Sequence, residues 1–172
     1  MIIIGIDPGV HTGYAEWHTE LQCFRYISSL KILDAIDSVK WVDSCEREIG
    51  GRLVIWEDAR LRTWFGTKGR ESLQGAGSIK RDCGIWEEFF AATGISNCPV
   101  KPQFGGTKWT APAFTKLTGW TERTNEHGRD AAMLVYGISS ARASQMLGAS
   151  TSARSSGTQG LASSVARPSA SK

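Results

Sequence analysis

Two short hydrophobic segments, each running directly into acidic residues, constrain the fold of this chain most. The first reads IIIGID from Ile2 to Asp7, and the second reads RLVIWED from Arg52 to Asp58. Runs this short and this apolar are typical of strands that are buried on both faces of a sheet. A charged group has no partner inside such a strand, so we expect Asp7 and Glu57 to lie where each strand leaves the core.

The rest of the chain alternates between strand and helix patterns. We predict further strands at 11–17, 21–28 and 98–101, a loop at 59–70, and helices at 30–48, 72–93, 107–117 and 125–147. Three antiparallel strands followed by α/β alternation predict an α/β fold with a mixed five-stranded sheet flanked by helices. We predict one domain over 1–147 and a disordered tail over 148–172, which is rich in Ala, Ser and Thr and contains no acidic residue.

Composition narrows the class of protein. The chain has 172 residues, of which 41% are hydrophobic and 22% charged, and its apolar runs are too short to span a membrane. The N-terminus lacks the pattern of a signal peptide, so we expect a cytoplasmic protein without a membrane partner. The four cysteines form no C-x-x-C pair, which favours reduced thiols over a zinc site.

A third polar group lies in the segment NEHGRDAAMLVYG, at 125–137. His127 and Asp130 are three residues apart, so they share one face of the predicted helix. The same face continues through Leu134 and Ile138, which are apolar, and we therefore expect the polar pair to face the core. Burial of such a pair is costly unless both groups are satisfied, and metal ligation would satisfy both.

These residues together predict a metal site. Adjacent strands would place Asp7 and Glu57 side by side, where two carboxylates repel unless a cation lies between them. Oxygen ligands select Mg²⁺ or Mn²⁺. Two such cations catalyse phosphodiester hydrolysis, and the candidate ligands are Asp7, Glu57, His127 and Asp130. Structural alternatives remain: a turn role for Asp7, a local salt bridge for Glu57, and helix capping for the last two residues.

A basic segment offers a binding surface for nucleic acid. From Arg60 to Arg81 the chain has six basic residues and one acidic residue, and Trp64 and Phe65 stand among them. Cations hold phosphates and exposed aromatic rings stack on unpaired bases. The candidate DNA-binding residues are Arg60, Arg62, Trp64, Phe65, Lys68, Arg70, Lys80 and Arg81. A solvated loop, with its aromatic rings packed beneath it, is the alternative interpretation.

Four motifs, in this order, resemble those of the RuvC family of Holliday-junction resolvases in the RNase H-like superfamily: GIDPG, TGYA, VIWE and EHGRDAA. The likeness extends over 2–142, and the stretches RLRTWFG and GGTKW are most similar to phage-encoded members. The resemblance implies an RNase H-like fold and a homodimer that cleaves four-way DNA junctions with two Mg²⁺ per active site, where Mn²⁺ substitutes. It also implies the cytoplasm of a bacterium or of a phage-infected host cell.

By position, the resemblance gives metal-binding and catalytic roles to Asp7, Glu57, His127 and Asp130. It gives a catalytic role near the scissile phosphate to Lys108, in GGTKW. Three other functions stay open: a nuclease for a broader range of branched or flap DNA, a non-catalytic junction-binding protein, and an ATP-dependent phosphotransferase of the actin and sugar-kinase type. The last would need a second domain around its nucleotide.

Overall fold

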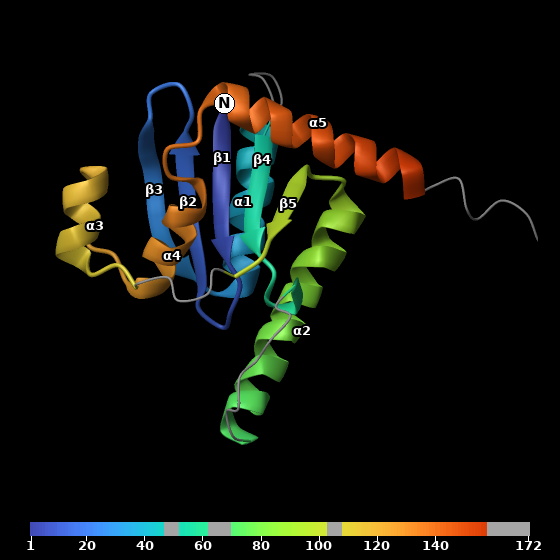
Figure 1. The fold of residues 1–172 in the computed structure, drawn as a ribbon, viewed down its shortest axis with the longest axis horizontal. Helices are drawn as coiled ribbons and strands as arrows, with labels where there is room; N and C mark the ends of the chain where they lie inside the picture. The colour runs from blue at the N-terminus through green and yellow to red at the C-terminus, as the bar shows by residue number, and fades with distance from the viewer. Residues whose placement is uncertain (47–51, 62–69, 103–107, 158–172) are drawn as a thin grey trace, which may run out of the picture.

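A central sheet lies between two layers of helices in the computed structural model, which describes residues 1–46, 52–61, 70–102 and 108–157 (Figure 1). The strands are β1 (Ile2–Asp7), β2 (Thr12–His18), β3 (Cys23–Leu30), β4 (Arg52–Glu57) and β5 (Asn97–Val100). The helices are α1 (Ile32–Glu46), the short 3-10 helix η1 (Ala59–Leu61), α2 (Arg70–Thr93), α3 (Ala111–Thr118), α4 (Glu126–Val135) and α5 (Ser140–Gly157).

The sheet has the order β3-β2-β1-β4-β5. The first three strands form an antiparallel meander, whereas β4 pairs parallel to β1 and β5 pairs parallel to β4. This mixed five-stranded sheet with flanking helices confirms the predicted RNase H-like fold class. The central position of β1 follows from its sequence, because a strand of isoleucines can be buried on both faces.

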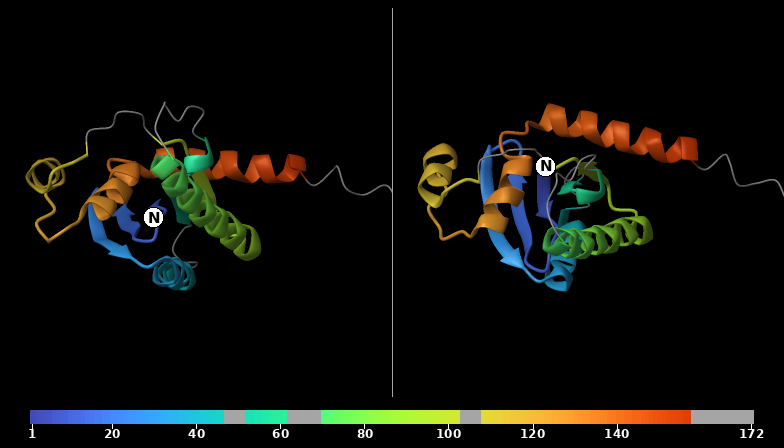
Figure 2. Two further views of the ribbon diagram at one scale, coloured as in Figure 1. Left: turned by 90° about the horizontal axis from the view of Figure 1, so that it is seen from below. Right: turned by 60° about the horizontal axis from the view of Figure 1, so that its bottom comes forward.

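Alternation along the strands divides the core into two layers. Ile4, Ile6 and Trp56 pack with α1 and α2 on one face, and Ile3 and Ile55 pack with α4 on the other. Figure 2 shows α1 and α4 on opposite sides of the sheet. Residues two apart in a strand therefore share one face of the sheet. This alternation determines on which face the polar residues at the strand ends lie.

The predicted helix over 125–147 is wrong, because the structure has two helices, α4 and α5, separated by Tyr136–Ser139. Gly137 lies between them with a φ of 74°, in the left-handed region that ends helices. The indole of Trp17, in β2, donates a hydrogen bond of 2.9 Å to the carbonyl oxygen of Ile138 and fixes the break against the sheet.

Other boundaries differ less. The predicted strands at 11–17 and 21–28 begin one or two residues later, because the turn between them occupies 19–22 rather than 18–20. Helix α5 continues to Gly157, ten residues into the segment predicted as a tail, where Ala and Ser recur and no proline intervenes. Residues 158–172 lie outside the described part, so the domain boundary stays a prediction. None of the helices in the described ranges is long and apolar enough to cross a membrane.

Candidate functional site

The carboxyl ends of β1 and β4 bring two acidic residues to one edge of the sheet. These strands are parallel neighbours whose register runs to Ile6 opposite Trp56, and Asp7 and Glu57 are the next residues. Side chains alternate between the two faces along a strand, so Asp7 lies on the same face as Ile3 and Gly5. Glu57 likewise shares the face of Leu53 and Ile55, and this face packs against α4. The sheet thus has both acidic residues at neighbouring strand ends, as predicted, and directs both carboxylates toward α4.

Helix α4 approaches β1 and β2 very closely, and two glycines permit this. A Cβ on Gly5 would overlap the carbonyl oxygen of Ala131, and a Cβ on Gly13 would overlap the carbonyl oxygen of His127. Gly13 is the β2 partner of Asp7, so the closest approach of the helix is beside the acidic strand end. The two glycines therefore determine how near His127 lies to Asp7.

His127 contacts Asp7 directly. Its Nδ1 lies 3.3 Å from Oδ2 of Asp7, and the two side chains are 37% and 21% exposed. The buried residues of α4 are Gly128, Ala131, Ala132 and Val135. Leu134 and Ile138 pack against the core as predicted, although both are only partly buried and Ile138 lies beyond the end of α4. His127 and Asp130 flank the buried stripe and remain accessible to a ligand.

The electrostatics of this edge disfavour negative charge. Burial raises the pKa of Asp7 to about 6, the His127 hydrogen bond opposes the rise, and the Asp130 carboxylate adds to it. Burial also raises the pKa of Asp130, against the attraction of Lys108 and His127. Since a raised pKa means that the charged form of each carboxylate is penalised here, a cation placed between them would stabilise their charged forms.

Lys108 lies at the same edge. Its Nζ donates a hydrogen bond of 2.7 Å to Oε2 of Glu126, and this contact raises the pKa of Lys108, with smaller effects of Asp130 and Asp7. The Lys108 side chain is 70% exposed. The structure therefore places Asp7 in contact with His127, puts Asp130 and Lys108 near enough to affect the pKa of Asp7 through their charges, and places Glu57 at the neighbouring strand end.

Two further residues contribute to this edge, and the sequence alone did not single them out. The ring of His11 stacks on that of His127, with centroids 6.3 Å apart. Arg129 fastens the segment that carries Lys108: its Nε donates to the carbonyl oxygen of Trp109 at 2.7 Å, and its Nη1 donates to that of Thr124 at 2.9 Å. Arg129 lies within the motif EHGRDAA, which is the signal that could have indicated it.

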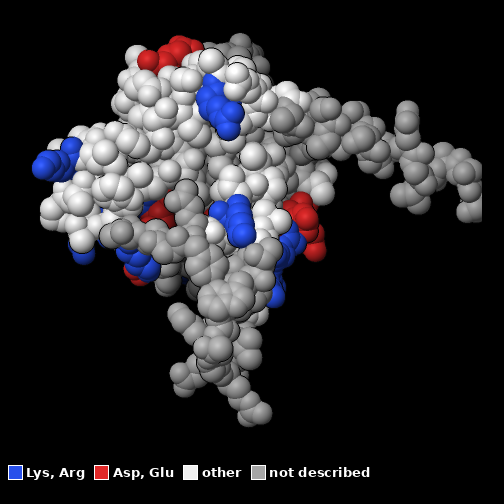
Figure 3. All heavy atoms as spheres, viewed as in Figure 1, with Lys and Arg blue, Asp and Glu red and all other residues white. Residues whose placement is uncertain are grey.

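The predicted DNA-binding residues are only partly described. Arg62, Trp64, Phe65 and Lys68 lie outside the described residues, and Arg70 is described only as the first residue of α2. Arg60 is held by Asp58 and Glu87, and Arg81 pairs with Asp82 at 3.3 Å while remaining 73% exposed. Lys80 is exposed on α2. On the face in Figure 3, basic side chains stand singly or in small groups among uncharged residues.

The donor set fits a hard divalent cation better than zinc, because it contains three carboxylates, one imidazole and no thiolate. The raised pKa of Asp7 indicates a carboxylate that positive charge would stabilise. Within the described ranges, no three His, Cys, Asp or Glu side chains stand close enough together to hold a metal ion. As the structure places them, these side chains do not form a ready-made metal site.

Comparison with known proteins gives a likeness among solved structures. No family model matches the chain, and no curated protein matches it either. Among solved structures, it is similar to T. thermophilus RuvC in complex with Holliday junction substrate, with a TM-score of 0.46 and 15% sequence identity. The similarity covers 84% of this chain and 96% of that chain. The fold assignment itself rests on the strand order and register given above.

Proposed function

We propose that this protein is a metal-dependent endonuclease that cleaves branched DNA, with four-way junctions as its preferred substrate. The observation that carries the proposal is the grouping of Asp7, His127 and Asp130 at one sheet edge, beside the strand end that bears Glu57. The ordered motifs that resemble RuvC-family resolvases support the choice of substrate.

The residues at this edge would bind the metal ions and contact the scissile phosphate. Asp7, Glu57, His127 and Asp130 would hold two Mg²⁺, or Mn²⁺ in their place. Bound cations supply a water of lowered pKa and stabilise charge on the leaving oxygen. His127 ligates only as the neutral imidazole, so its protonation would weaken binding of the ions. Lys108, exposed beside the carboxylates, would lie against a phosphate oxygen of the scissile bond.

A homodimer is the proposed active form. A four-way junction has twofold symmetry, so a C2 dimer would match two active sites to two opposed cleavage points. Gly77 and Ser78 on α2 are small and exposed, which would allow close approach of a second copy. Sedimentation of the protein with a junction tests this, and a complex that contains one copy per junction would contradict the dimer.

The proposal is tested with a panel of synthetic substrates: four-way junction, flap, fork and linear duplex, each incubated with Mg²⁺, with Mn²⁺ or with EDTA. We expect nicking that requires a divalent ion and is fastest on the junction. A wild type that leaves every substrate intact would overturn the proposal. Equal rates on flap and junction would retain the nuclease and broaden its substrate.

The same panel separates a nuclease from a protein that only binds junctions. Ca²⁺ takes oxygen ligands like Mg²⁺ but in a larger and more flexible geometry, so affinity is measured in Ca²⁺ and cleavage in Mg²⁺. Binding in Ca²⁺ with no cleavage in either Mg²⁺ or Mn²⁺ would identify a non-catalytic junction-binding protein.

A further inference from the structure

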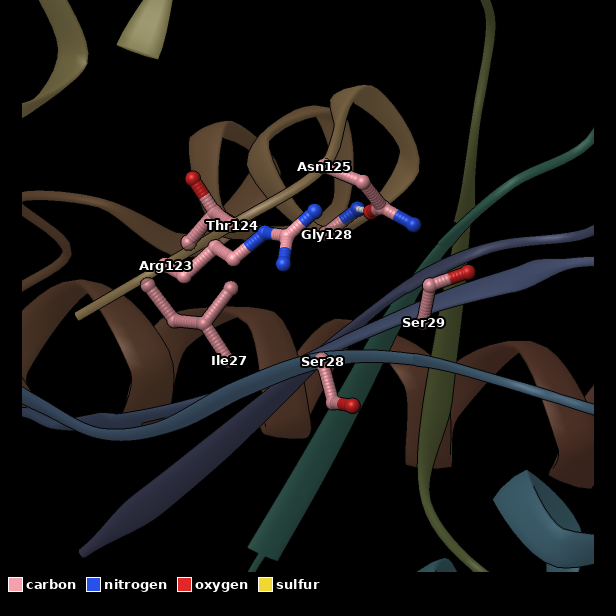
Figure 4. Close-up of a pocket in the computed structure, with 7 residues that line it drawn as sticks. All are labelled: Ile27, Ser28, Ser29, Arg123, Thr124, Asn125 and Gly128. Carbon is pink, nitrogen blue, oxygen red and sulfur yellow. Dashed lines mark hydrogen bonds between the residues drawn. The ribbon is translucent and has the colours of Figure 1, made fainter. Parts of the chain in front are cut away.

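A cavity of about 360 Å³ lies next to the candidate active site, between β3 and the residues that lead into α4. It is lined by Ile27, Ser28, Ser29, Arg123, Thr124, Asn125 and Gly128. Figure 4 shows the Arg123 side chain reaching back toward Asn125 and Gly128, with Ser29 on the β3 side of the hollow. The cavity therefore combines one guanidinium with hydroxyl groups and a helix start.

The cavity lies in a fixed relation to Asp7. The sheet register aligns Asp7 with Gly13, and Gly13 with Ser29, so the three residues form one row across β1, β2 and β3. Ser29 is two residues after Ile27 in β3, so both lie on the face of the sheet that packs against α4. Since neighbouring strands are about 4.8 Å apart, Ser29 lies about 10 Å from Asp7 on the same face of the sheet.

Arg123 is the unpaired cation of this cavity. It is exposed, and it makes no hydrogen bond or ion pair with any residue of the described ranges. The nearby acid Glu126 is held by Lys108 at 2.7 Å. The amide of Gly128 is capped by Oδ1 of Asn125 at 2.9 Å, so the helix start adds the field of its dipole rather than a free donor.

We infer that this cavity binds a backbone phosphate of the DNA strand being cut, through the guanidinium of Arg123 and the hydroxyl of Ser29. The inference rests on the proposed function. A DNA strand advances about 3.4 Å per nucleotide along the helix axis, so a site about 10 Å from Asp7 would take a phosphate within about three nucleotides of the scissile one. Such a contact would fix the register of the strand in the active site without reading its sequence.

The test measures junction affinity in Ca²⁺ over a range of salt concentrations. Each phosphate contact contributes about 0.9 to the slope of log K against log salt, so Arg123→Gln should reduce the slope by about 0.9. It should weaken binding roughly five- to tenfold, and Arg123→Lys should keep the wild-type slope. In Mg²⁺, Arg123→Gln should raise KM while leaving kcat unchanged, because the chemical groups are intact.

Lys40→Gln is the matched control. Lys40 lies on α1, across the sheet, and is 54% exposed; its Nζ pairs with exposed Asp37 at 3.2 Å and lies 5.9 Å from the centroid of the Phe89 ring. We expect its slope and affinity to equal those of the wild type. An Arg123→Gln protein with the wild-type slope, or a Lys40→Gln protein with the same loss, would overturn the phosphate site while a nicking wild type still supports the nuclease. A wild type that neither binds nor nicks DNA would instead overturn the proposed function.

Discussion

Two carboxylates at the ends of neighbouring strands differ in how the protein satisfies them. Asp58 follows β4 and accepts three hydrogen bonds from Arg60: Nε at 2.8 Å, Nη2 at 2.8 Å and the backbone amide at 3.0 Å. Asp7, at the end of β1, contacts the His127 ring at 3.3 Å. Both side chains are largely buried, so the difference lies in their partners.

The pKa values of the two groups move in opposite directions. Burial raises the pKa of Asp58, but the Arg60 hydrogen bonds outweigh it and hold the pKa below its usual value. Burial raises the pKa of Asp7 to about 6, and Asp130 adds to the rise. Asp58 is thus satisfied within the chain, whereas the pKa of Asp7 stays raised despite its contact with His127, which supports the proposal that a cation binds there.

The sharpest test of this contrast is Asp7→Asn, for which we expect the rate of junction nicking in Mg²⁺ to fall at least about 10³-fold, or about 4 kcal/mol. The amide keeps the shape but loses the charge that would hold the ions. The matched control is Asp37→Asn on α1, whose side chain is 74% exposed. Undiminished nicking by Asp7→Asn, measured in a gel assay, would remove Asp7 from the active site.

The next effect concerns the glycines that let α4 reach Asp7. Gly13→Ala should lower the free energy of unfolding by roughly 3 kcal/mol or more, because its methyl group would overlap the backbone of His127, which cannot rotate away. Gly84→Ala in α2 is the matched control, since a Cβ there meets nothing within 4 Å. Helix propensity predicts that Gly84→Ala is neutral or stabilises by up to about 1 kcal/mol. Urea denaturation measures both, and equal stabilities would contradict the close approach.

Much of the fold was predictable because its strongest signals are local. The runs at β1 and β4 predicted buried strands whose acidic ends would meet if the strands were adjacent, and β1 and β4 are parallel neighbours. The break between α4 and α5 was missed because Leu134 and Ile138 continue the helical spacing across it. A single glycine, Gly137, supplied too weak a signal against that periodicity.

The partners of the site residues were harder to predict than the residues themselves. Arg60 was predicted as a DNA contact from the basic segment, yet its Nη1 also donates to Oε2 of Glu87 at 2.6 Å, so the guanidinium is held between two acids. Glu87 comes from α2, and no spacing in the sequence links it to Arg60. A role for Arg60 on DNA stays a prediction, in competition with these ion pairs.

Asp58→Asn tests whether the carboxylate held by Arg60 stabilises the fold. We expect a loss of about 2–3 kcal/mol in the free energy of unfolding, because the charge-assisted bonds from Arg60 are weakened inside the protein. The nicking rate per folded molecule should change little, which separates this variant from Asp7→Asn. Calorimetry together with the gel assay measures both quantities. A stable but inactive Asp58→Asn would show that the two carboxylates have been assigned to the wrong roles.

A smaller effect is expected on the pH dependence of the metal-free protein. The folded-state pKa of Asp7 lies above its usual value of 3.8, so its charged form is penalised above about pH 6. The penalty disappears as the pH falls from about 6 to 4. Over that window the free energy of unfolding of the wild type should rise by about 2 kcal/mol relative to that of Asp7→Asn. Asp58 acts oppositely: its stabilisation is lost only as the pH falls below its usual pKa. Parallel stability curves for wild type and Asp7→Asn in EDTA would contradict the shift.

The smallest effect is the thermal stabilisation by Mg²⁺ itself. An ion that binds only the folded state at ten times its Kd contributes about 1.4 kcal/mol, or roughly 3–6 °C in Tm for a chain of this size. Asp58→Asn should show the same increment as wild type, because its charge is matched by Arg60 rather than by an ion. Asp7→Asn should show a smaller increment, because it removes the carboxylate that the ion would neutralise. Scanning calorimetry with and without Mg²⁺ measures all three, and an unreduced increment in Asp7→Asn would mean that the ion binds elsewhere on the folded chain.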